Sequence, residues 1–165
     1  MQRANCLQSK WRNAVFFLTA LLIVAADQLS KGWIRSYPEE QPIFEMGFFR
    51  LTHVHNTGAA FGLFQGHSFA LTIVALVGVI ILLVYALFIY RHFPLDNRLS
   101  KPALGLILGG TVGNLIDRLN PNLDGVTDFI SIGFWPAFNI ADSAITVGVI
   151  IFAYSLLRLT QAKKH

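Results

Sequence analysis

Long apolar runs separated by short polar segments dominate the chain, and their lengths predict membrane-spanning helices. A helix needs about 20 mostly apolar residues to cross the hydrocarbon core. Residues 69–90 carry no charge, and residues 102–119 and 140–157 form two further runs. The apolar run at residues 14–26 is too short alone and reaches spanning length only if its helix continues to residue 34. The pattern therefore predicts four transmembrane helices, at residues 14–34, 69–90, 102–119 and 140–157.

The first apolar run has an alternative interpretation as a secretory signal peptide. Arg3, Lys10 and Arg12 would form its basic region, and residues 24–26 (Val-Ala-Ala) would form a small-residue cleavage site. This interpretation is the weaker one, because no soluble mature domain follows the run. The polar residues after it are better explained by the site considered below.

The segment between the first two spans is too polar and too interrupted to cross a membrane. Residues 44–55 are rich in aromatic and β-branched side chains, which favours one or two short strands, and Gly47 can mark a turn between them. We expect a small sheet at the outer, periplasmic surface, formed within an extracytoplasmic segment at about residues 35–67. Gly105 and Gly109 form a GxxxG pair in the third span, which predicts close helix packing. The predicted fold is mostly α, a polytopic membrane protein forming a single integral membrane domain over residues 1–165.

Composition excludes most other classes of protein. Hydrophobic residues make up 54% of the 165 residues and charged residues only 13%, about half the roughly 25% of an average soluble domain. So few charges cannot cover a soluble surface. The apolar content also argues against intrinsic disorder. The single cysteine, Cys6, excludes a disulfide scaffold and has no assigned role.

The basic residues predict the orientation of the four spans. Lysine and arginine accumulate on the cytoplasmic side of membrane proteins. Three basic groups flank alternate ends of the spans: Arg3, Lys10 and Arg12; Arg91, Arg98 and Lys101; and Arg158, Lys163 and Lys164. Four spans place all three groups on one side, so both termini are expected in the cytoplasm. This flanking pattern explains the net charge of +4 without nucleic-acid binding.

This topology brings several polar residues to one depth, at the outer edge of the hydrocarbon core. They lie near the outer ends of the first, third and fourth spans, or in the loop between the last two: Asp27, Lys31, Asn114, Asp117, Arg118, Asp128, Asn139 and Asp142. Ionisable groups at membrane depth usually face a protein interior or a water-filled cavity. We therefore expect a polar pocket enclosed by helices and open toward the outer surface.

Each of these residues also has an ordinary structural interpretation. Asp27 and Lys31 can form an intrahelical i, i+4 ion pair, and Asp117 with Arg118 can anchor a helix at the interface. Asn139 can cap the fourth helix with Asp142 at its third position. Asp128 can be a plain loop carboxylate after a turn. These separate interpretations do not explain why all of these polar residues lie at the same depth in the membrane.

Among the chemistries that such a pocket can support, a carboxylate pair fits the residues best. Cys6 lies on the cytoplasmic side and no serine has an evident base partner, so nucleophilic catalysis is disfavoured. His53 and His55 share a strand face, but no further metal ligand has recognisable spacing, and no metal or other cofactor is expected. Asp128 and Asp142 can share a proton, so that one polarises a carbonyl while the other activates water.

Which aspartate holds that proton is a softer hypothesis. Asp142 lies in the first turn of a predicted helix, where the helix dipole favours an anion. Asp128 lacks that support, so we expect it to carry the shared proton more often, although the two groups titrate as a pair.

Five segments, in order, resemble the signatures of the lipoprotein signal peptidases, also called type II signal peptidases. They are residues 27–31 (DQLSK), 56–61 (NTGAAF), 113–118 (GNLIDR), 126–129 (VTDF) and 138–142 (FNIAD). The resemblance covers about residues 14–157. Members of this family are aspartic endopeptidases of the bacterial cytoplasmic (inner) membrane. They remove signal peptides from prolipoproteins by cutting before a diacylglyceryl-modified cysteine.

The resemblance also implies roles for individual residues. Asp128 and Asp142 would form the catalytic pair. Asn56, Gly58, Asn114, Arg118 and Asn139 would line or order the pocket, with Asp27, Lys31, Asp117 and Ala141 supporting it. The implied partners are diacylglyceryl-modified prolipoproteins and membrane lipids, and a monomer is the default expectation.

Two other classes of function compete with this one. Intramembrane carboxylates together with Lys31 and Arg118 could form a proton relay in an ion- or proton-coupled transporter. However, the polar residues occupy one side only, and the second span has almost none. A structural subunit of a membrane complex, with charges that only anchor helices, is the other alternative.

Overall fold

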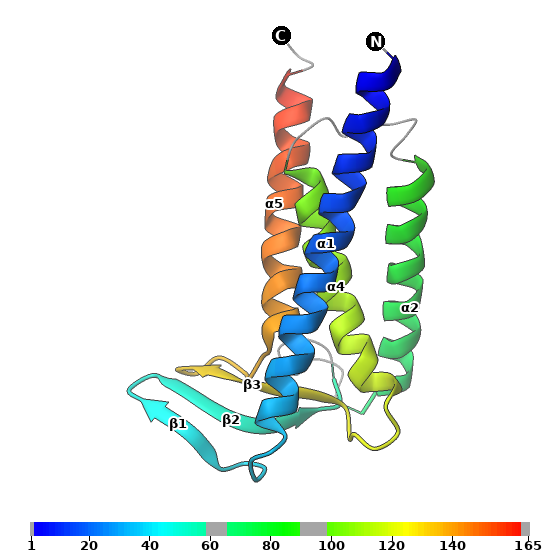
Figure 1. The fold of residues 1–165 in the computed structure, drawn as a ribbon. Helices are drawn as coiled ribbons and strands as arrows, with labels where there is room; N and C mark the ends of the chain where they lie inside the picture. The colour runs from blue at the N-terminus through cyan, green and yellow to red at the C-terminus, as the bar shows by residue number, and fades with distance from the viewer. Residues whose placement is uncertain (1, 59–65, 90–98, 163–165) are drawn as a thin grey trace.

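Four α-helices and a small sheet make up the part of the chain that the computed structural model describes, which is residues 2–58, 66–89 and 99–162. The helices are α1 (Gln2–Ile34), α2 (Ser68–Val84), α4 (Ser100–Leu119) and α5 (Ile140–Ala162), and a π-helical turn, η2 (Tyr85–Ile89), continues α2. The strands are β1 (Pro42–Met46), β2 (Phe49–Asn56) and β3 (Val126–Ile132). The helices form one bundle, with the start of α1 and the end of α5 at one end and the sheet at the other (Figure 1).

Helix α4 is the central helix of the bundle and packs against α1, α2 and α5. Three helical segments are long and apolar enough to cross a membrane, at Asn13–Ile34, Ser68–Phe88 and Ile140–Arg158. Helix α4, which covers the predicted span at 102–119, is not among these segments. Its neighbours bury much of its surface, including Lys101, Asn114 and Asp117. A helix shielded in this way can carry polar side chains, because its lipid-facing surface is small.

The outer faces of α1, α2 and α5 carry the large apolar side chains that the hydropathy pattern predicts. Leu21, Ile81 and Ile150 are each more than half exposed in the isolated chain. The interior core is small by comparison and is built around Phe16, Ala20, Ala86, Leu104 and Leu108. Such an inside-out distribution of apolar side chains is expected where the surrounding solvent is lipid.

Glycines bring α4 into backbone contact with its neighbours. A Cβ atom on Gly105 would lie 2.7 Å from the carbonyl oxygen of Phe16, and one on Gly109 would lie 2.7 Å from that of Ala20. The predicted GxxxG pair therefore faces α1. Gly110 makes an even closer approach to the carbonyl oxygen of Ala141 on α5. Small residues allow this contact between helices that no hydrophobic effect drives together in lipid.

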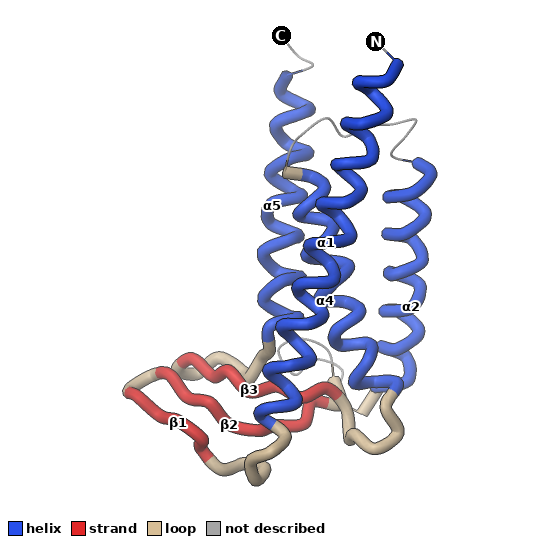
Figure 2. Tube along the Cα trace, viewed as in Figure 1, coloured by secondary structure: helices blue, strands red, loops and turns tan. Residues whose placement is uncertain are grey.

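The sheet is antiparallel with the order β1-β2-β3 and lies across the end of the bundle (Figure 2). Of the one or two strands expected over residues 44–55, the structure has two, β1 and β2, which form an antiparallel hairpin with Gly47 at a φ of +60° in the turn between them. Strand β3 was not expected, and it corrects the placement of Asp128, which lies on this strand and not in a plain loop. The segment pairs with β2 across about 70 residues of sequence, from Asn56 to Val126, a partnership that no local pattern reveals.

A buried ion network joins α1 to α4 at the sheet end of the bundle. Asp27, Lys31 and Asp117 are each 0% exposed. The ammonium group of Lys31 lies 2.8 Å from a carboxylate oxygen of Asp27 and 3.2 Å from one of Asp117. The i, i+4 pair expected within the first helix is therefore present, and a second carboxylate from α4 shares its cation.

The same network also reaches the sheet and α5. Arg35 lies 2.7 Å from Asp117, and the backbone N–H of Thr127 on β3 donates to Asp117 at 3.0 Å. The backbone N–H of Ala141 on α5 donates to Asp27 at 3.0 Å. Helix α1 runs unbroken through residues 24–26, so the small residues considered as a cleavage site lie inside a helix whose following turn anchors the bundle.

Substitution of Gly109 tests the close packing of α4 on α1. We expect Gly109→Ala to lower the free energy of unfolding by about 1–3 kcal/mol, because the new methyl group meets backbone atoms that cannot move aside. The matched control is Gly78→Ala in α2, where a Cβ meets nothing within 4 Å and alanine should stabilise by about 0.8–1.0 kcal/mol. Thermal unfolding in detergent measures both, and equal changes would contradict the packing account.

Removal of the shared cation tests the ion network. We expect Lys31→Met to destabilise the protein by about 3–5 kcal/mol, since it leaves the buried carboxylate of Asp27 without a cation and leaves Asp117 with Arg35 alone. Arg50→Met is the control, because Arg50 is 54% exposed and pairs with Glu45 at 3.4 Å on the sheet surface, where such pairs contribute about 0–1 kcal/mol. Denaturant unfolding of both variants gives the comparison, and similar small losses would show that the buried network contributes little.

Candidate active site

Asp128 and Asp142 meet at the junction of the sheet and the bundle. Asp128 lies on β3 and is 1% exposed, and Asp142 lies in the first turn of α5 and is 8% exposed. Neither carboxylate forms a direct ion pair with a lysine or arginine among the described residues. Neutral amide groups hold both of them.

Asn139 holds both carboxylates at once. Its side-chain Nδ2 donates to Asp128 at 2.7 Å. Its side-chain Oδ1 accepts the backbone N–H of Asp142 at 2.9 Å, and its own backbone N–H donates to the Asp142 carboxylate at 3.3 Å. These last two bonds form a reciprocal capping arrangement at the start of α5. The expected cap therefore exists, and the same side chain also reaches the second aspartate.

Asn114 links the carboxylates to the ion network. Its Nδ2 donates to Asp142 at 2.8 Å, while its Oδ1 accepts from Lys31 at 2.9 Å and from Asn139 at 3.0 Å. A buried amide that satisfies three partners is rigidly oriented. The position of Asp142 is therefore fixed from α4 as well as from its own helix.

Asn56 approaches Asp128 from the neighbouring strand. Its Nδ2 donates to the second oxygen of Asp128 at 2.8 Å, and its Oδ1 accepts the backbone N–H of Gly58 at 2.8 Å. Arg118 donates to the carbonyl oxygen of Gly58 at 2.9 Å. The structure thus brings Asn56, Gly58 and Arg118 together beside Asp128. Ala59, Ala60 and Phe61 of the same motif lie outside the described residues.

The pKa of Asp128 is raised from its ordinary value to about 7. Burial is the main cause, and the nearby charge of Asp142 adds to it, while the hydrogen bonds from Asn56 and Asn139 act in the opposite direction. Near neutral pH this carboxyl group is therefore able to hold a proton beside a second carboxylate. That property is the one expected of an acid–base pair.

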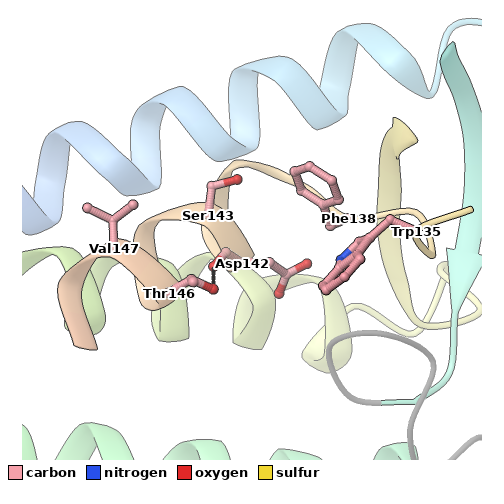
Figure 3. A pocket seen from close by; sticks show the side chains of 6 residues that line it. All are labelled: Trp135, Phe138, Asp142, Ser143, Thr146 and Val147. Atoms are coloured by element: carbon pink, nitrogen blue, oxygen red, sulfur yellow. Dashed lines mark hydrogen bonds between the residues drawn. The ribbon is translucent and has the colours of Figure 1, made fainter. Parts of the chain in front are cut away.

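An apolar groove opens on Asp142 (Figure 3). It has a volume of about 300 Å³ and runs along the first two turns of α5, and its lining residues are Trp135, Phe138, Asp142, Ser143, Thr146 and Val147. In Figure 3 the carboxylate of Asp142 lies between the aromatic side chains at one end of the groove and Thr146 toward the other. An extended apolar segment in this groove would pass the carboxylate.

Sequence reasoning assigned no role to several residues of the site. Arg35 donates to Thr127 at 2.8 Å in addition to its contact with Asp117. Gln28 donates to Asp117 at 3.1 Å and to the carbonyl oxygen of Gly113 at 3.0 Å. Helical spacing could have found Arg35, because it follows Lys31 by four residues and shares its face. Trp135 gave no such signal, and Phe138 stood only as the first residue of the fifth signature segment.

Comparison with known proteins identifies the family. The family described as signal peptidase (SPase) II matches residues 19–158 of this chain. The chain is 52% identical over 141 residues to a lipoprotein signal peptidase of Dehalococcoides mccartyi, covering 84% of this chain and 86% of the relative. It is 46% identical over 145 residues to the lipoprotein signal peptidase of Moorella thermoacetica, covering 86% of this chain and 92% of the relative.

A solved structure gives the same result for the fold. A bacterial membrane enzyme determined at 2.3 Å resolution aligns with 91% of this chain and 92% of its own, at 30% sequence identity and a TM-score of 0.79. The family match, the relatives and the shared fold together show that this chain belongs to the signal peptidase II family.

Proposed function

We propose that Asp128 and Asp142 are the catalytic pair with which this chain hydrolyses prolipoproteins, on the N-terminal side of the diacylglyceryl-modified cysteine. Membership of the family makes the chain a lipoprotein signal peptidase, an aspartic peptidase that removes prolipoprotein signal peptides. The observation that carries the assignment of the pair is the position of Asn139, which binds both buried carboxylates through one side chain and its own backbone.

The hydrolysis needs one acid and one base. Asp142, as the carboxylate, takes a proton from water, whose oxygen attacks the scissile carbonyl carbon. Asp128, as the acid, donates its proton to the carbonyl oxygen, so that a neutral tetrahedral intermediate forms. The proton on Asp142 then passes to the amide nitrogen and the carbon–nitrogen bond breaks, while one hydroxyl of the intermediate returns its proton to Asp128. A carboxylic acid and an amine leave, and both aspartates regain their starting protonation states. No metal or other cofactor takes part in this scheme.

The groove beside Asp142 suits an apolar substrate. A signal peptide is an apolar segment that reaches the enzyme from the membrane, and the groove is lined mainly by Trp135, Phe138 and Val147. Its position on α5 would let the peptide lie along the bundle while its lipid chains stay in hydrocarbon. Asn56, Gly58 and Arg118 would order the opposite wall of the pocket.

We further propose a specific membrane arrangement for the single domain. Helices α1, α2, α4 and α5 all span the bacterial cytoplasmic membrane, with both termini in the cytoplasm, and the sheet lies at the outer surface beside the active site. Figure 1 shows the sheet and the start of α5 at the same end of the bundle, and Asp128 lies on β3 while Asp142 lies in the first turn of α5, which supports this arrangement. Arg91, Arg98, Lys163 and Lys164, which contribute to the orientation argument, lie outside the described residues. A monomer suffices, because every proposed catalytic group comes from one chain.

Replacement of either aspartate by asparagine tests the catalytic pair. We expect Asp128→Asn and Asp142→Asn each to lower kcat/KM for a prolipoprotein by about 10²–10⁴-fold or more, because each removes one of the two proton-transfer groups. Cleavage of a lipid-modified prolipoprotein by purified enzyme, followed by gel shift or mass spectrometry, measures the rate.

The control for this experiment is Glu45→Gln, which neutralises an exposed carboxylate on β1. Strand β2 separates β1 from β3, the strand that carries Asp128. It should retain the wild-type rate. Unaltered cleavage by either aspartate variant, in protein that unfolds at the wild-type temperature, would rule out the proposed pair.

The pH profile tests the protonation of Asp128. Its pKa is raised to about 7, so the group is protonated below that pH and loses its proton above it. If the protonated form is the acid, kcat/KM should fall as the pH rises through about 7. Asn56→Ala removes a hydrogen bond that lowers this pKa, so it should move the alkaline limb to higher pH. A limb that stays in place in the Asn56 variant would argue against Asp128 as the acid.

A further inference from the structure

A second cluster of titratable side chains lies on the sheet, apart from the aspartate pair. Glu39 precedes β1, while His53 and His55 are alternate residues of β2. One ligand atom from each of the three lies within 4.8 Å of the others. Successive residues of a strand point to opposite faces, so His55 and its neighbour Asn56, which binds Asp128, belong to opposite faces of β2.

The ring of His53 has an unused nitrogen inside the protein. His53 is 5% exposed, and its Nδ1 lies 3.0 Å from the carbonyl oxygen of Tyr37. A carbonyl oxygen only accepts, so Nδ1 carries the hydrogen, and in the neutral ring Nε2 keeps a lone pair. This Nε2 is buried and has no hydrogen-bond partner among the residues that the structure describes. A histidine that donates one N–H to a backbone carbonyl and offers the other nitrogen is arranged as metal-bound histidines usually are.

His55 and Glu39 complete a set of nitrogen and oxygen ligands. Nε2 of His55 lies 3.2 Å from Oε1 of Glu39. The ring centroids of His53 and His55 are 4.9 Å apart. A tetrahedral zinc ion with ligand bonds of about 2.0–2.1 Å holds its ligand atoms roughly 3.3 Å from one another. Glu39 and His55 already have that spacing, and all three ligand atoms lie within 4.8 Å of one another. The side chain of Glu39 is 62% exposed, so small rotamer changes at the surface can bring the set to the spacing that zinc requires.

The surroundings of the cluster suit a divalent cation. The three residues line a polar hollow of about 340 Å³ that also contains Arg35 and Asp124. The positive charge of Arg35 is balanced by Asp117, 2.7 Å away. Two further carboxylates, Glu39 and Asp124, line the hollow and can balance the charge of a divalent ion. The volume of the hollow leaves room for water as a fourth ligand.

We propose that Glu39, His53 and His55 bind one divalent transition-metal ion, for which zinc is the representative, and that this ion is structural. Two imidazoles and one carboxylate are a donor set that zinc accepts, whereas calcium and magnesium prefer oxygen alone. The bound ion fastens the connection after α1 to β2, the strand that carries Asn56 to the aspartate pair. The inference does not depend on the proposed catalytic roles.

Zinc titration of the purified full chain in detergent, after removal of metal with a chelator, tests this site. We expect one Zn²⁺ per chain with a dissociation constant of about 1 μM or below, measured by isothermal titration calorimetry and native mass spectrometry. Added Zn²⁺ should also raise the unfolding temperature, because an ion that binds only the folded state stabilises it.

Three substitutions separate the cluster from other zinc-binding groups. Glu39→Gln and His55→Gln should each weaken zinc binding by at least about 10-fold and abolish the rise in unfolding temperature. His67→Gln is the matched control, since His67 is an exposed histidine outside the cluster, and it should bind zinc as the wild type does. Absence of stoichiometric binding, wild-type affinity in both cluster variants, or an equal loss in the His67 variant would each overturn the proposal.

Discussion

The pairing of buried charges at the end of the bundle is the constraint on which the rest of the structure depends. A lone charge in an apolar interior costs several kcal/mol, so the cation of Lys31 and the carboxylates of Asp27 and Asp117 have to meet. They come from two helices, and their hydrogen bonds extend to β3 and α5. The paired carboxylates of α1 and α4 then accept backbone hydrogen bonds from β3 and α5, which fixes where these two elements pack.

Two asparagines, Asn114 and Asn139, connect the ion network to the aspartate pair. An amide side chain both donates and accepts hydrogen bonds without adding charge. Asn114 can therefore accept a hydrogen bond from Lys31 through its oxygen and donate one to Asp142 through its nitrogen. Asn139 does the same between the cap of α5 and Asp128. The two carboxyl groups can stay close because neutral amide groups donate hydrogen bonds to each of them. Lys31 lies behind Asn114, and although its charge lowers the pKa of Asp128, that pKa remains raised to about 7.

The sequence was most informative where local patterns determine the outcome. Apolar runs predicted the helices, and their polar ends predicted that Asp27, Asn114 and Asp142 would lie at one depth. The strand character of Val126–Ile132 and the contact of Ala141 with Asp27 could not be predicted in this way, because they join residues 70 to 114 positions apart. The burial of His53 was missed for the same reason. Its Nδ1 lies 3.0 Å from the carbonyl oxygen of Tyr37, a residue that precedes the strands.

The two carboxyl groups of the proposed pair belong to different elements of the fold, Asp128 to a strand and Asp142 to a helix. Asp128 is positioned through the pairing of β3 with β2, and Asp142 is positioned through the packing of α5 on α4. A chain in which either the sheet or α5 is out of place would therefore lack the proposed pair, so hydrolysis by that pair requires both elements to be folded.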